Sequence, residues 1–404
     1  MIIKPAIRNN LYLNAHPIGC SEYVKELFDE AKKLANFDGP KRVLIIGGSS
    51  GYGLSSRVTL AQNANASTIN VSFESRPKDQ RTGTAGYWNN IAFLKQAKKL
   101  DSKHYDILGN AFSPKIKEVA IDKIKETFGQ VDLVIYSLAA GARLNFETNE
   151  MVYSAIKPIG EDMAGKTLDV ATKKIKDINI SAATEDEIKG TVFVMGGSDW
   201  KAWVEALDQA GVLAPQAKTV SYTYVGSGTM DKIYRSGTIG RAKDDLEATA
   251  NTLNELLKHK YQGEAMVSSS KAVTTKASVF IPGITSYISC LFDVMKEQGT
   301  HESILAHKHR LFKDMIYGEK RITDSKNRVR IDHYEMDSVV QTKTNECVLA
   351  HQDESIFELP GTNKFISEFH HINGFGYDGV DYDADVDFET LAPKDLNLMD
   401  CMDL

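Results

Sequence analysis

The sequence predicts an α/β protein built on a doubly wound parallel sheet. Apolar runs typical of buried strands alternate along the chain with segments whose apolar residues recur at helical spacing. Strands that helices cover on both faces have to be apolar throughout, and the run at 41–48 meets that requirement. This alternation favours parallel strands joined by helices. The predicted strands are 41–48, 67–75, 104–112, 131–141, 190–200 and 218–226.

Helices are predicted where apolar residues recur every three to four positions. The first occupies residues 21–37, with Ser21 as its candidate N-cap, and the Gly39-Pro40 pair ends it. Another is expected over 248–261.

Composition and charge narrow the class of protein. The 404 residues are 42% hydrophobic and 25% charged, as in soluble globular proteins. A net charge of −6 gives no reason to expect nucleic acid or an anionic membrane as partner. No run approaches the roughly 18 apolar residues of a spanning helix, and the first ten residues lack the apolar core of a secretory signal. We expect a cytoplasmic protein without stable membrane insertion.

The cysteines are widely spaced and form no CxxC motif. In a reducing cytosol we expect all four to be free thiols: Cys20, Cys290, Cys347 and Cys401.

The first predicted strand ends in a glycine-rich loop, "IIGGSSGYGLSSR". Gly47, Gly51 and Gly53 let the backbone turn tightly and approach a pyrophosphate. A helix predicted from Tyr52 would offer unpaired N–H groups and the positive end of its dipole. A strand, glycines and a helix in this order predict a dinucleotide-binding loop rather than an ordinary turn.

Glu74, at the end of the second predicted strand, indicates which dinucleotide binds. Its carboxylate can accept hydrogen bonds from the adenosine ribose hydroxyls and would repel a 2′-phosphate, so NADH is favoured over NADPH. Arg76 is the opposing signal, because a guanidinium can hold that phosphate. From sheet order alone, the Asn110-Ala111 pair would border the adenine, and the Leu138-Ala139 pair the nicotinamide ribose.

Tyr234 and Lys243 are the candidate catalytic pair, with eight residues between them. On one continuous helix nine positions rotate by about 900°, which places the two side chains on opposite faces. Gly237 and Gly240 disfavour a helix around Tyr234, so we expect the tyrosine on a loop. The next helix would then carry Lys243 in its first two turns, capped by Ser236 or Thr238.

A loop tyrosine can fold back over that first turn and meet the lysine. The charge of Lys243, if within about 4–6 Å, would lower the pKa of Tyr234. Tyr234 would then be a stronger proton donor to an atom that develops negative charge. The ammonium of Lys243 would also hydrogen-bond the nicotinamide ribose.

Tyr224 ends the sixth predicted strand, where strand ends point into the ligand crevice of such a sheet. It can donate a hydrogen bond to a substrate carbonyl oxygen. Ser221 competes for this role but faces the other way by strand alternation, so Tyr224 is preferred.

No metal site is predicted. The segment "DYDADVD" at 381–387 lacks the Gly and Glu that a calcium loop needs, and we expect a solvated strand face there. The three histidines of 301–310 do not form an H-E-x-x-H motif.

Taken together, these motifs resemble the single-polypeptide trans-2-enoyl-CoA/enoyl-acyl-carrier-protein reductases of the FabV type. The resemblance covers nearly the whole chain, and the Tyr-x8-Lys spacing is its most specific mark. It is carried by "MIIKPAIR" (1–8), "VLIIGGSSGYGLSSR" (43–57), "SFESRP" (72–77), "YSLAAGAR" (136–143), "VMGGSDW" (194–200), "IYRSGTIGRAKDDLE" (233–247), "VTTKAS" (273–278) and "DGVDYDADVD" (378–387).

The resemblance implies a short-chain-dehydrogenase-like Rossmann core with large insertions and a C-terminal extension. We expect one domain of residues 1–404, with its NAD-binding core at 41–300, an insertion at about 143–190, and the extension at 301–404. A monomer is expected.

The resemblance also implies roles for particular residues. Tyr234 would donate the proton, Lys243 would contact NAD, and Tyr224 would touch the substrate. Two departures from the family pattern are Asn110, where Asp is usual, and the segment 226–230. The cofactor would be lined by Gly47, Gly48, Ser49, Ser50, Gly51, Tyr52, Phe73, Glu74, Asn110, Ala111, Leu138, Ala139, Ala272, Val273 and Thr274.

The implied reaction is NADH-dependent reduction of the 2,3 double bond of an enoyl thioester in fatty-acid synthesis. Two alternatives stay open: a carbonyl reductase or alcohol dehydrogenase on the same scaffold, and a non-catalytic NAD-binding regulator. The carrier (coenzyme A or acyl carrier protein), the chain length and a flavin's involvement are also left open.

Overall fold

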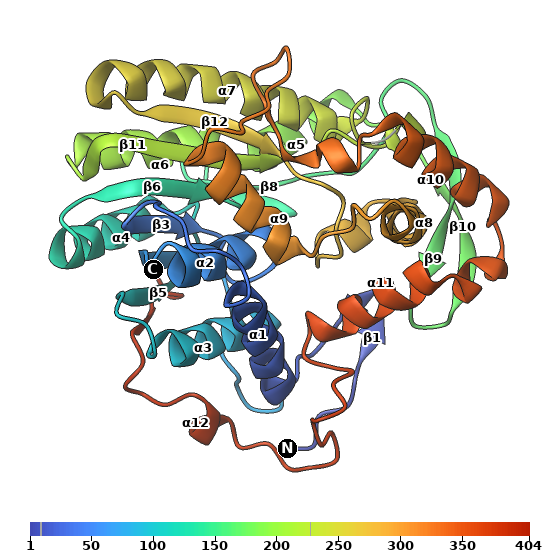
Figure 1. Ribbon diagram of the computed structural model, residues 1–404, viewed down its shortest axis with the longest axis horizontal. Coiled ribbons are helices and arrows are strands. Elements are labelled where there is room, and N and C mark those ends of the chain that lie inside the picture. The colour runs from blue at the N-terminus through green and yellow to red at the C-terminus, as the bar shows by residue number, and fades with distance from the viewer. Residues whose placement is uncertain (9, 227) are drawn as a thin grey trace. The chain divides into compact units, whose positions relative to one another are not determined.

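The structure, a computed structural model, describes residues 1–8, 10–226 and 228–404. The chain divides into two compact units. Figure 1 labels their helices and strands. Unit 1 consists of Met1–Ser137, Glu302–Lys320 and Ile366–Leu404, and unit 2 of Leu138–His301 and Arg321–Phe365. The expectation of a single domain stays a prediction.

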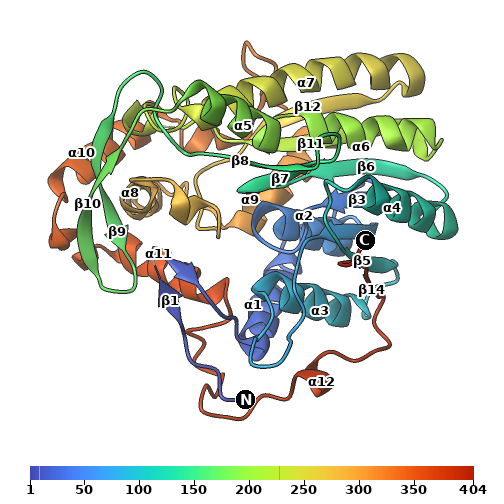
Figure 2. The same cartoon turned by 180° about the vertical axis from the view of Figure 1, so that it is seen from behind.

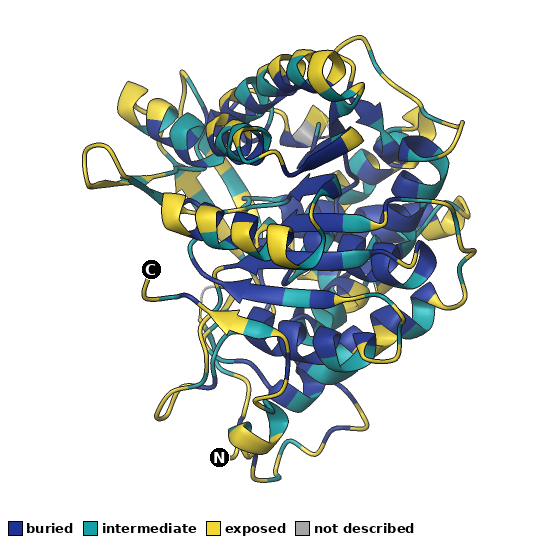
Figure 3. Ribbon diagram, turned by 90° about the vertical axis from the view of Figure 1, so that its left-hand side faces the viewer, coloured by how far each residue is buried: buried dark blue, intermediate teal, exposed yellow. Residues whose placement is uncertain are grey.

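Unit 1 contains a parallel sheet whose strands follow the order β6-β3-β4-β5-β14. The order β5-β4-β3-β6 is the 3-2-1-4 order of a dinucleotide-binding half-sheet, so the predicted fold class is confirmed here. Strands β3 to β6 are almost wholly buried, as their continuous apolar runs require, whereas the edge strand β14 is largely exposed (Figure 3). The strands are β3 (Arg42–Ile46), β4 (Ser67–Ser72), β5 (His104–Leu108), β6 (Val131–Tyr136) and β14 (Leu398–Asp400), and a separate hairpin joins β1 (Ile7–Arg8) to β2 (Leu11–Tyr12).

The helices of unit 1 pack on this sheet and on one another. Helix α1 packs against α2 and α3, and α2 also contacts α9. The helices are α1 (Pro17–Ala31), α2 (Gly51–Asn63), α3 (Ala85–Ala97), α4 (Pro114–Thr127), α9 (Ile304–Arg310) with a π-helical turn at Leu311–Ile316, and α12 (Phe388–Leu391); α11 (Pro360–His371) crosses from unit 2 into unit 1.

The first helix begins and ends earlier than predicted. Its N-cap is His16 rather than Ser21, and the imidazole accepts a hydrogen bond from the Gly19 N–H. Pro17 occupies the first helical position, where its fixed φ favours the helix and its missing N–H costs nothing. The helix therefore starts four residues before the predicted cap.

A buried ion pair links α2 to β5. The guanidinium of Arg57 donates to both carboxylate oxygens of Asp106, over 2.8 and 3.0 Å, and neither side chain is exposed to solvent. Asn70 on β4 donates a further hydrogen bond to Asp106. Two charges in this dry interior are tolerable only together.

Unit 2 has a parallel sheet in the order β13-β12-β11. The predicted strand at 218–226 is confirmed as β11 (Leu213–Thr223), which starts earlier and ends just before Tyr224. Strand β12 (Glu264–Ser269) was not predicted, and β13 (Val329–Arg330) is very short. The remaining elements are α5 (Glu185–Met195), α6 (Ser198–Gln209), α7 (Thr238–Tyr261), α8 (Ile284–Glu297), α10 (Ser338–Ala350) and short helical turns at Gly228–Met230, Ser278–Phe280, Ile331–Tyr334 and Glu354–Glu358.

The predicted strand at 190–200 is wrong, because α5 and α6 occupy that segment. A capping box starts α5: Thr184 accepts from the Glu187 N–H, and the Glu187 carboxylate accepts from the Thr184 N–H. Three acidic residues in the first turn complement the helix dipole. The apolar run is partly buried in α5, where Gly190, Thr191 and Val194 are covered, and periodicity alone cannot tell so short an apolar helical run from a strand.

The segment predicted as an insertion folds mainly into two antiparallel hairpins. The first pairs β7 (Ala142–Asn145) with β8 (Glu150–Tyr153), and the second pairs β9 (Met163–Asp169) with β10 (Lys174–Ile180). Figure 2 shows β9 and β10 as two long neighbouring strands.

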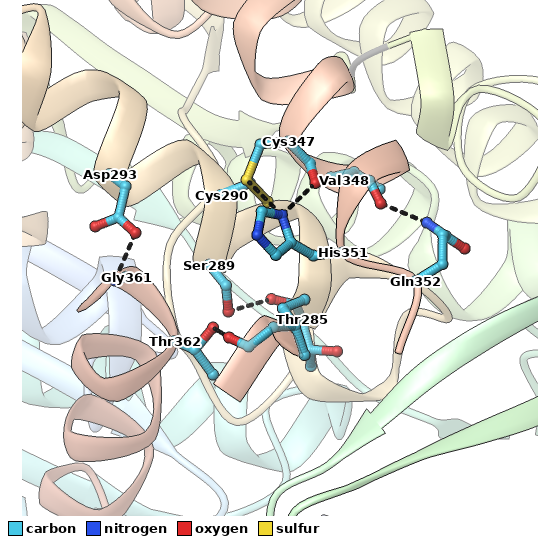
Figure 4. The surroundings of a disulfide bond; sticks show 11 residues. Thr285, Ser289, Cys290, Asp293, Cys347, Val348, His351, Gln352, Gly361 and Thr362 are labelled. Carbon is cyan, nitrogen blue, oxygen red and sulfur yellow. Dashed lines mark hydrogen bonds between the residues drawn. A yellow bond between two sulfur atoms is a disulfide. The ribbon is translucent and has the colours of Figure 1, made fainter. Parts of the chain in front are cut away.

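A disulfide between Cys290 and Cys347 overturns the prediction that all four cysteines are free thiols. Helices α8 and α10 pack side by side, and the two Cα atoms lie 5.8 Å apart although 57 residues separate them in sequence. Figure 4 shows the bond with the His351 ring beside it. Cys20 and Cys401 are buried and form no disulfide with any described residue.

The predicted strand face at 381–387 is also wrong. These residues form turns and irregular backbone, and Asp387 caps α12. The carboxylates of Asp383 and Asp385 instead pair with Lys4 and the N-terminal ammonium.

Replacing Asp106 with alanine should destabilise unit 1 severely. The substitution leaves the Arg57 charge buried without its partner, which costs about 3–5 kcal/mol in comparable sites. Denaturant-induced unfolding followed by circular dichroism measures the loss.

The matched control is Glu118→Ala, which breaks the exposed ion pair with Lys115 on α4. We expect its unfolding midpoint to equal that of the unmodified protein. Equal midpoints for the Asp106 and Glu118 variants would contradict the assigned role of the buried pair.

Candidate functional site

The glycine-rich loop after β3 has the backbone that a dinucleotide requires. Gly47 and Gly51 adopt positive φ angles of 92° and 54°, which glycine tolerates best. A Cβ on Gly53 would lie 2.0 Å from the Gly47 carbonyl oxygen, so only glycine allows α2 to start this close to the strand. The helix begins at Gly51 after Ser50, whose side chain makes no capping hydrogen bond. The first-turn N–H groups of α2 are thus left without that cap.

Side chains from β4 and α3 hold this loop in place. The Asn70 amide oxygen accepts from the Gly48 N–H over 2.8 Å, and the Ser49 hydroxyl donates to Glu74 over 2.6 Å. The Asn89 amide donates to the Ser49 carbonyl oxygen over 3.0 Å. The loop is therefore fixed before any ligand arrives.

Tyr52, in the first turn of α2, lies under a buried cation. The Lys308 ammonium on α9 is 4.3 Å from the centroid of the Tyr52 ring. Burial holds the pKa of Lys308 well below its usual value. Nothing in the local sequence around Lys308 singled it out as a neighbour of the loop.

The other predicted residues of unit 1 follow β4 and β5 at the same edge of the sheet. Phe73 is exposed, Glu74 is half-buried, and Asn110 caps its own turn by accepting from the Phe112 N–H. Arg76, the signal for a 2′-phosphate, pairs with Asp400 on β14 over 2.5 Å. Asp400 therefore already partners this guanidinium.

Tyr234 lies on a turn at 231–236, as predicted, and the turn is fastened to the start of α7. The Tyr234 carbonyl oxygen accepts from the N–H groups of Gly237 and Gly240, over 3.2 and 2.9 Å. A Cβ on Gly240 would lie 1.8 Å from the Arg235 carbonyl oxygen, so glycine permits this close approach. The Arg235 guanidinium adds ion pairs to Asp244 and Glu247 of α7.

The predicted cap of this helix is wrong. The N-cap is Gly237, without a side-chain hydrogen bond, and Thr238 is the first helical residue. The Thr238 hydroxyl donates instead to the Ala155 carbonyl oxygen. Ser236 donates to Asp231 within the turn, so neither predicted side chain is available to the helix N-terminus.

Lys243 lies in the second turn of α7, and its ammonium donates to the Tyr222 carbonyl oxygen over 3.4 Å. Burial lowers the pKa of Lys243 to about 8. The expected lowering of the Tyr234 pKa is not found: burial raises the pKa of Tyr234 above its usual value, and Arg235 is the cation that opposes this effect. Direct contact between the Tyr234 phenol and the Lys243 ammonium stays a prediction.

Tyr224 and Tyr234 are in ring contact, with centroids 4.9 Å apart and planes at 76°. Both are buried. The Tyr224 hydroxyl donates to Glu335 over 2.9 Å, and the same carboxylate accepts from the Ala272 N–H over 2.6 Å. Glu335 therefore joins the predicted substrate tyrosine to the predicted cofactor segment 272–274.

Glu335 and its second phenol partner, Tyr287, were not predicted from the sequence. The carboxylate accepts from the Tyr287 hydroxyl over 2.8 Å, and Glu335 is fully buried. Glu335 lies in a charge-rich tail that follows the core in sequence, where a solvated carboxylate is the ordinary expectation. Its burial follows only from the packing of unit 2.

The predicted cofactor segment also offers an unpaired polar atom. The Thr274 hydroxyl is buried without a hydrogen-bond partner in the described part of the chain, as is that of Thr223 at the end of β11. Buried hydroxyls are normally paired, so these two fit a polar ligand. In unit 1 the glycine cradle, considered by itself, fits the pyrophosphate of a dinucleotide.

Other predicted positions are placed as follows. Leu138 and Ala139 follow β6 in the chain. Ser221 is buried within β11. Ser227, in the segment 226–230 that departs from the family pattern, lies outside the described residues. No described helix has the length and apolar character to cross a membrane.

One group of possible metal ligands occurs among the described residues. Ligand atoms of Cys290, Cys347 and His351 lie within 4.8 Å of one another. The two sulfur atoms are bonded to each other, which leaves no thiolate for a metal. The expectation of no metal site stays a prediction.

Comparisons with known proteins cover almost the entire chain. It is 44% identical over 392 residues to a trans-2-enoyl-CoA reductase [NADH] of Clostridium perfringens, covering 97% of this chain and 100% of that one. It is 42% identical over 397 residues to an enoyl-[acyl-carrier-protein] reductase [NADH] of Photobacterium profundum, covering 97% and 99%. The Clostridium acetobutulicum trans-2-enoyl-CoA reductase, solved in complex with NADH, superimposes with a TM-score of 0.94 at 41% identity over 97% of this chain and 99% of that one.

Three family models match consecutive parts of the chain. Residues 2–79 match the NAD(P)H binding domain of trans-2-enoyl-CoA reductase, and residues 81–317 match the trans-2-enoyl-CoA reductase catalytic region. The first contains the glycine-rich loop and Glu74, and the second contains Tyr224, Tyr234 and Lys243. Residues 323–386 match a model described as the enoyl reductase FAD binding domain.

The residues of 323–386 do not fit a flavin dinucleotide. This segment, all of it described, consists mainly of short helical turns and the helices α10 and α11, without a strand–glycine loop–helix unit. At the start of α11 the Gly361 N–H donates to the Asp293 carboxylate, which would repel a pyrophosphate. No step is assigned to a flavin.

Replacing Gly53 with alanine should abolish tight dinucleotide binding. The new Cβ would lie 2.0 Å from the Gly47 carbonyl oxygen, so the loop has to move away from Gly47. We expect the affinity for NADH to fall by roughly 10²-fold, because the backbone N–H groups no longer face the pyrophosphate accurately. Calorimetric titration with NADH measures the change. Gly379→Ala is the control, because a Cβ there meets open space; unchanged affinity in the Gly53 variant would contradict the cradle.

Stability should depend on pH through Glu335. Burial raises the pKa of this carboxyl from 4.5 to about 7, so the folded state binds its proton more tightly than the unfolded state. The stabilisation is fully present below about pH 4.5 and is lost as the pH rises through about 7. The free energy of unfolding, measured with denaturant between about pH 4.5 and 7, should decrease less with rising pH in Glu335→Gln than in the unmodified protein. An equal pH dependence of the unfolding free energy in the two proteins would contradict the assignment.

Proposed function

Because the chain belongs to the trans-2-enoyl-CoA reductase family, we propose that it catalyses the NADH-dependent reduction of the 2,3 double bond of trans-2-enoyl thioesters. The product is the saturated acyl thioester, as fatty-acid synthesis requires. Relatives at 42–44% identity over nearly their full length carry the corresponding NADH-dependent names.

The observation that carries the proposal is a pair of buried phenols that precede a helix carrying a half-buried lysine. Tyr224 directly follows β11, and Tyr234 packs edge-on against its ring. The turn that carries Tyr234 is fastened to the helix that carries Lys243. Two buried O–H donors suit a substrate oxygen that becomes negatively charged.

The chemistry at the substrate follows from these donors. Bound NADH supplies a hydride to the β-carbon of the enoyl thioester. Negative charge then develops on the thioester oxygen as an enolate, and a hydrogen bond from Tyr224 or Tyr234 stabilises it. Tyr234 is the proposed source of the proton that completes the reaction. Its high pKa in the buried site keeps it protonated and able to donate.

Lys243 is proposed to contact the coenzyme through its ammonium. A pKa of about 8 leaves this group mostly charged at neutral pH. In unit 1, the loop at 47–52 would hold the pyrophosphate through backbone N–H groups, and Glu74 would accept hydrogen bonds from the adenosine ribose. The pairing of Arg76 with Asp400 supports NADH rather than NADPH as the coenzyme.

The decisive experiment is a coenzyme oxidation assay on crotonyl-CoA, run with NADH and NADPH in parallel. We expect turnover with NADH and a clear preference for it. Crotonyl-acyl-carrier-protein in the same assay identifies the preferred carrier. Turnover of acetoacetyl-CoA alone would overturn the proposal in favour of a carbonyl reductase, and binding of NADH without any turnover would favour a regulator.

Replacing Tyr234 with phenylalanine tests the proton donor. Loss of one donor to a developing oxyanion costs about 2.7–4 kcal/mol, so kcat should fall by about 10²–10³. NADH affinity should stay unchanged because the ring is retained.

The matched control is Tyr261→Phe, at the far end of the same helix. Its hydroxyl donates to Asp208, and we expect full activity after its removal. Full activity of the Tyr234 variant would remove that residue from the mechanism.

A further inference from the structure

Glu335 occupies the centre of a closed hydrogen-bond network in unit 2. It follows the short helical turn Ile331–Tyr334, and its side chain is fully buried. One carboxylate oxygen, Oε1, accepts from the hydroxyls of both Tyr224 and Tyr287, over 2.9 and 2.8 Å. The other, Oε2, accepts from the Ala272 N–H over 2.6 Å. All three donors to the carboxylate are neutral.

Helices α8 and α10 fix the geometry of this network. The Gln341 amide on α10 donates to the Tyr287 hydroxyl and to the Glu335 carbonyl oxygen, both over 2.8 Å. Tyr287 lies one turn before Cys290 on α8, and the disulfide from Cys290 to Cys347 ties that helix to α10. The Tyr287 phenol therefore has little freedom to leave the carboxylate.

A tyrosine has only one hydroxyl hydrogen to donate. In this structure Tyr224 donates that hydrogen to Glu335. For Tyr224 to stabilise the thioester oxygen in the proposed reaction it needs the same hydrogen, which cannot serve both acceptors at once. An ionised Glu335 is the stronger competitor, because a hydrogen bond to a carboxylate is charge-assisted.

We propose that Glu335 is a positioning residue whose protonation state directs the hydroxyl hydrogen of Tyr224. Ionised Glu335 retains the hydrogen, whereas protonated Glu335 donates its own O–H to the Tyr224 oxygen and releases the tyrosine hydrogen toward the thioester oxygen. No covalent bond forms or breaks in this change, and the proton comes from solvent. The inference rests on the proposed enoyl-thioester reduction and assigns a new residue to it.

The surroundings place this change near neutral pH. Burial raises the pKa of Glu335 to about 7, opposed by its hydrogen bonds to Ala272, Tyr287 and Tyr224. The negative charge of Asp332 raises it further.

The neighbouring cations interact with other groups. Arg330 pairs with Asp332, and the ammonium of Lys271, next to Ala272 in the chain, lies 5.5 Å from the centroid of the Phe292 ring. The protonated and ionised forms of Glu335 are therefore both accessible in the physiological range.

Glutamine at position 335 imitates the protonated form. The Ala272 N–H requires an acceptor, so the amide oxygen of Gln would face it and the NH₂ group would face the phenols. Its two hydrogens can then be donated to the oxygens of Tyr224 and Tyr287. The hydrogen of Tyr224 is thereby free for the substrate at every pH.

The test is the pH dependence of kcat for crotonyl-CoA reduction at saturating NADH, in the intact protein and in Glu335→Gln. The unmodified protein should lose about tenfold in kcat per pH unit above about pH 7 as Glu335 ionises. The kcat of the variant should stay constant until Lys243 titrates near pH 8. At about pH 8 the kcat of the variant should therefore be about ten times that of the unmodified protein. The KM for crotonyl-CoA should change less than kcat.

Tyr287→Phe provides a second, independent readout. It removes one hydrogen bond that favours the ionised carboxylate, so the decline in kcat should move to higher pH while the rate on the acidic side is retained. A shift in this direction supports the inference even if Glu335→Gln does not fold.

The outcomes separate the two proposals. An unchanged pH profile in both variants, or a loss of kcat in Glu335→Gln that is equal at every pH, would overturn the role of Glu335 while leaving enoyl reduction intact. Absence of crotonyl-CoA turnover by the unmodified protein at every pH would overturn the proposed function itself.

Discussion

Parallel strands of one sheet all end at the same edge, and this constraint places the functional residues of each unit. In unit 1 the strands β3, β4 and β5 are followed by the glycine-rich loop, Glu74 and Asn110. In unit 2 β11 and β12 are followed by Tyr224 and the segment 272–274. Residues far apart in sequence therefore meet at strand ends, where backbone groups and side chains are not consumed by the sheet.

Two buried carboxylates show how the same chemical group serves different ends. Asp106 faces the guanidinium of Arg57 in a dry interior, so its charge is matched and its role is structural. Glu335 is equally buried but accepts hydrogen bonds from two phenols and a backbone N–H, none of which carries charge. Burial destabilises its ionised form more than these hydrogen bonds stabilise it, so the pKa of Glu335 is raised to about 7.

Much of the fold was predictable because its signals are local. Four of the predicted strands in unit 1 and the loop position of Tyr234 are confirmed, since each follows from an apolar run or from nearby glycines. The segment 190–200 was mistaken for a strand because a buried helix and a buried strand share an apolar run. The disulfide escaped prediction because only the packing of α8 on α10 brings Cys290 and Cys347 together.

The amino-acid sequence alone determined the parallel α/β fold, the glycine cradle and the Tyr-x8-Lys pair, because backbone freedom, strand burial and helix periodicity are properties of neighbouring residues. Only the tertiary structure decided that Glu335 is buried against Tyr224, and that burial raises rather than lowers the pKa of Tyr234. Desolvation depends on every element packed around a group. No stretch of sequence carries that information by itself.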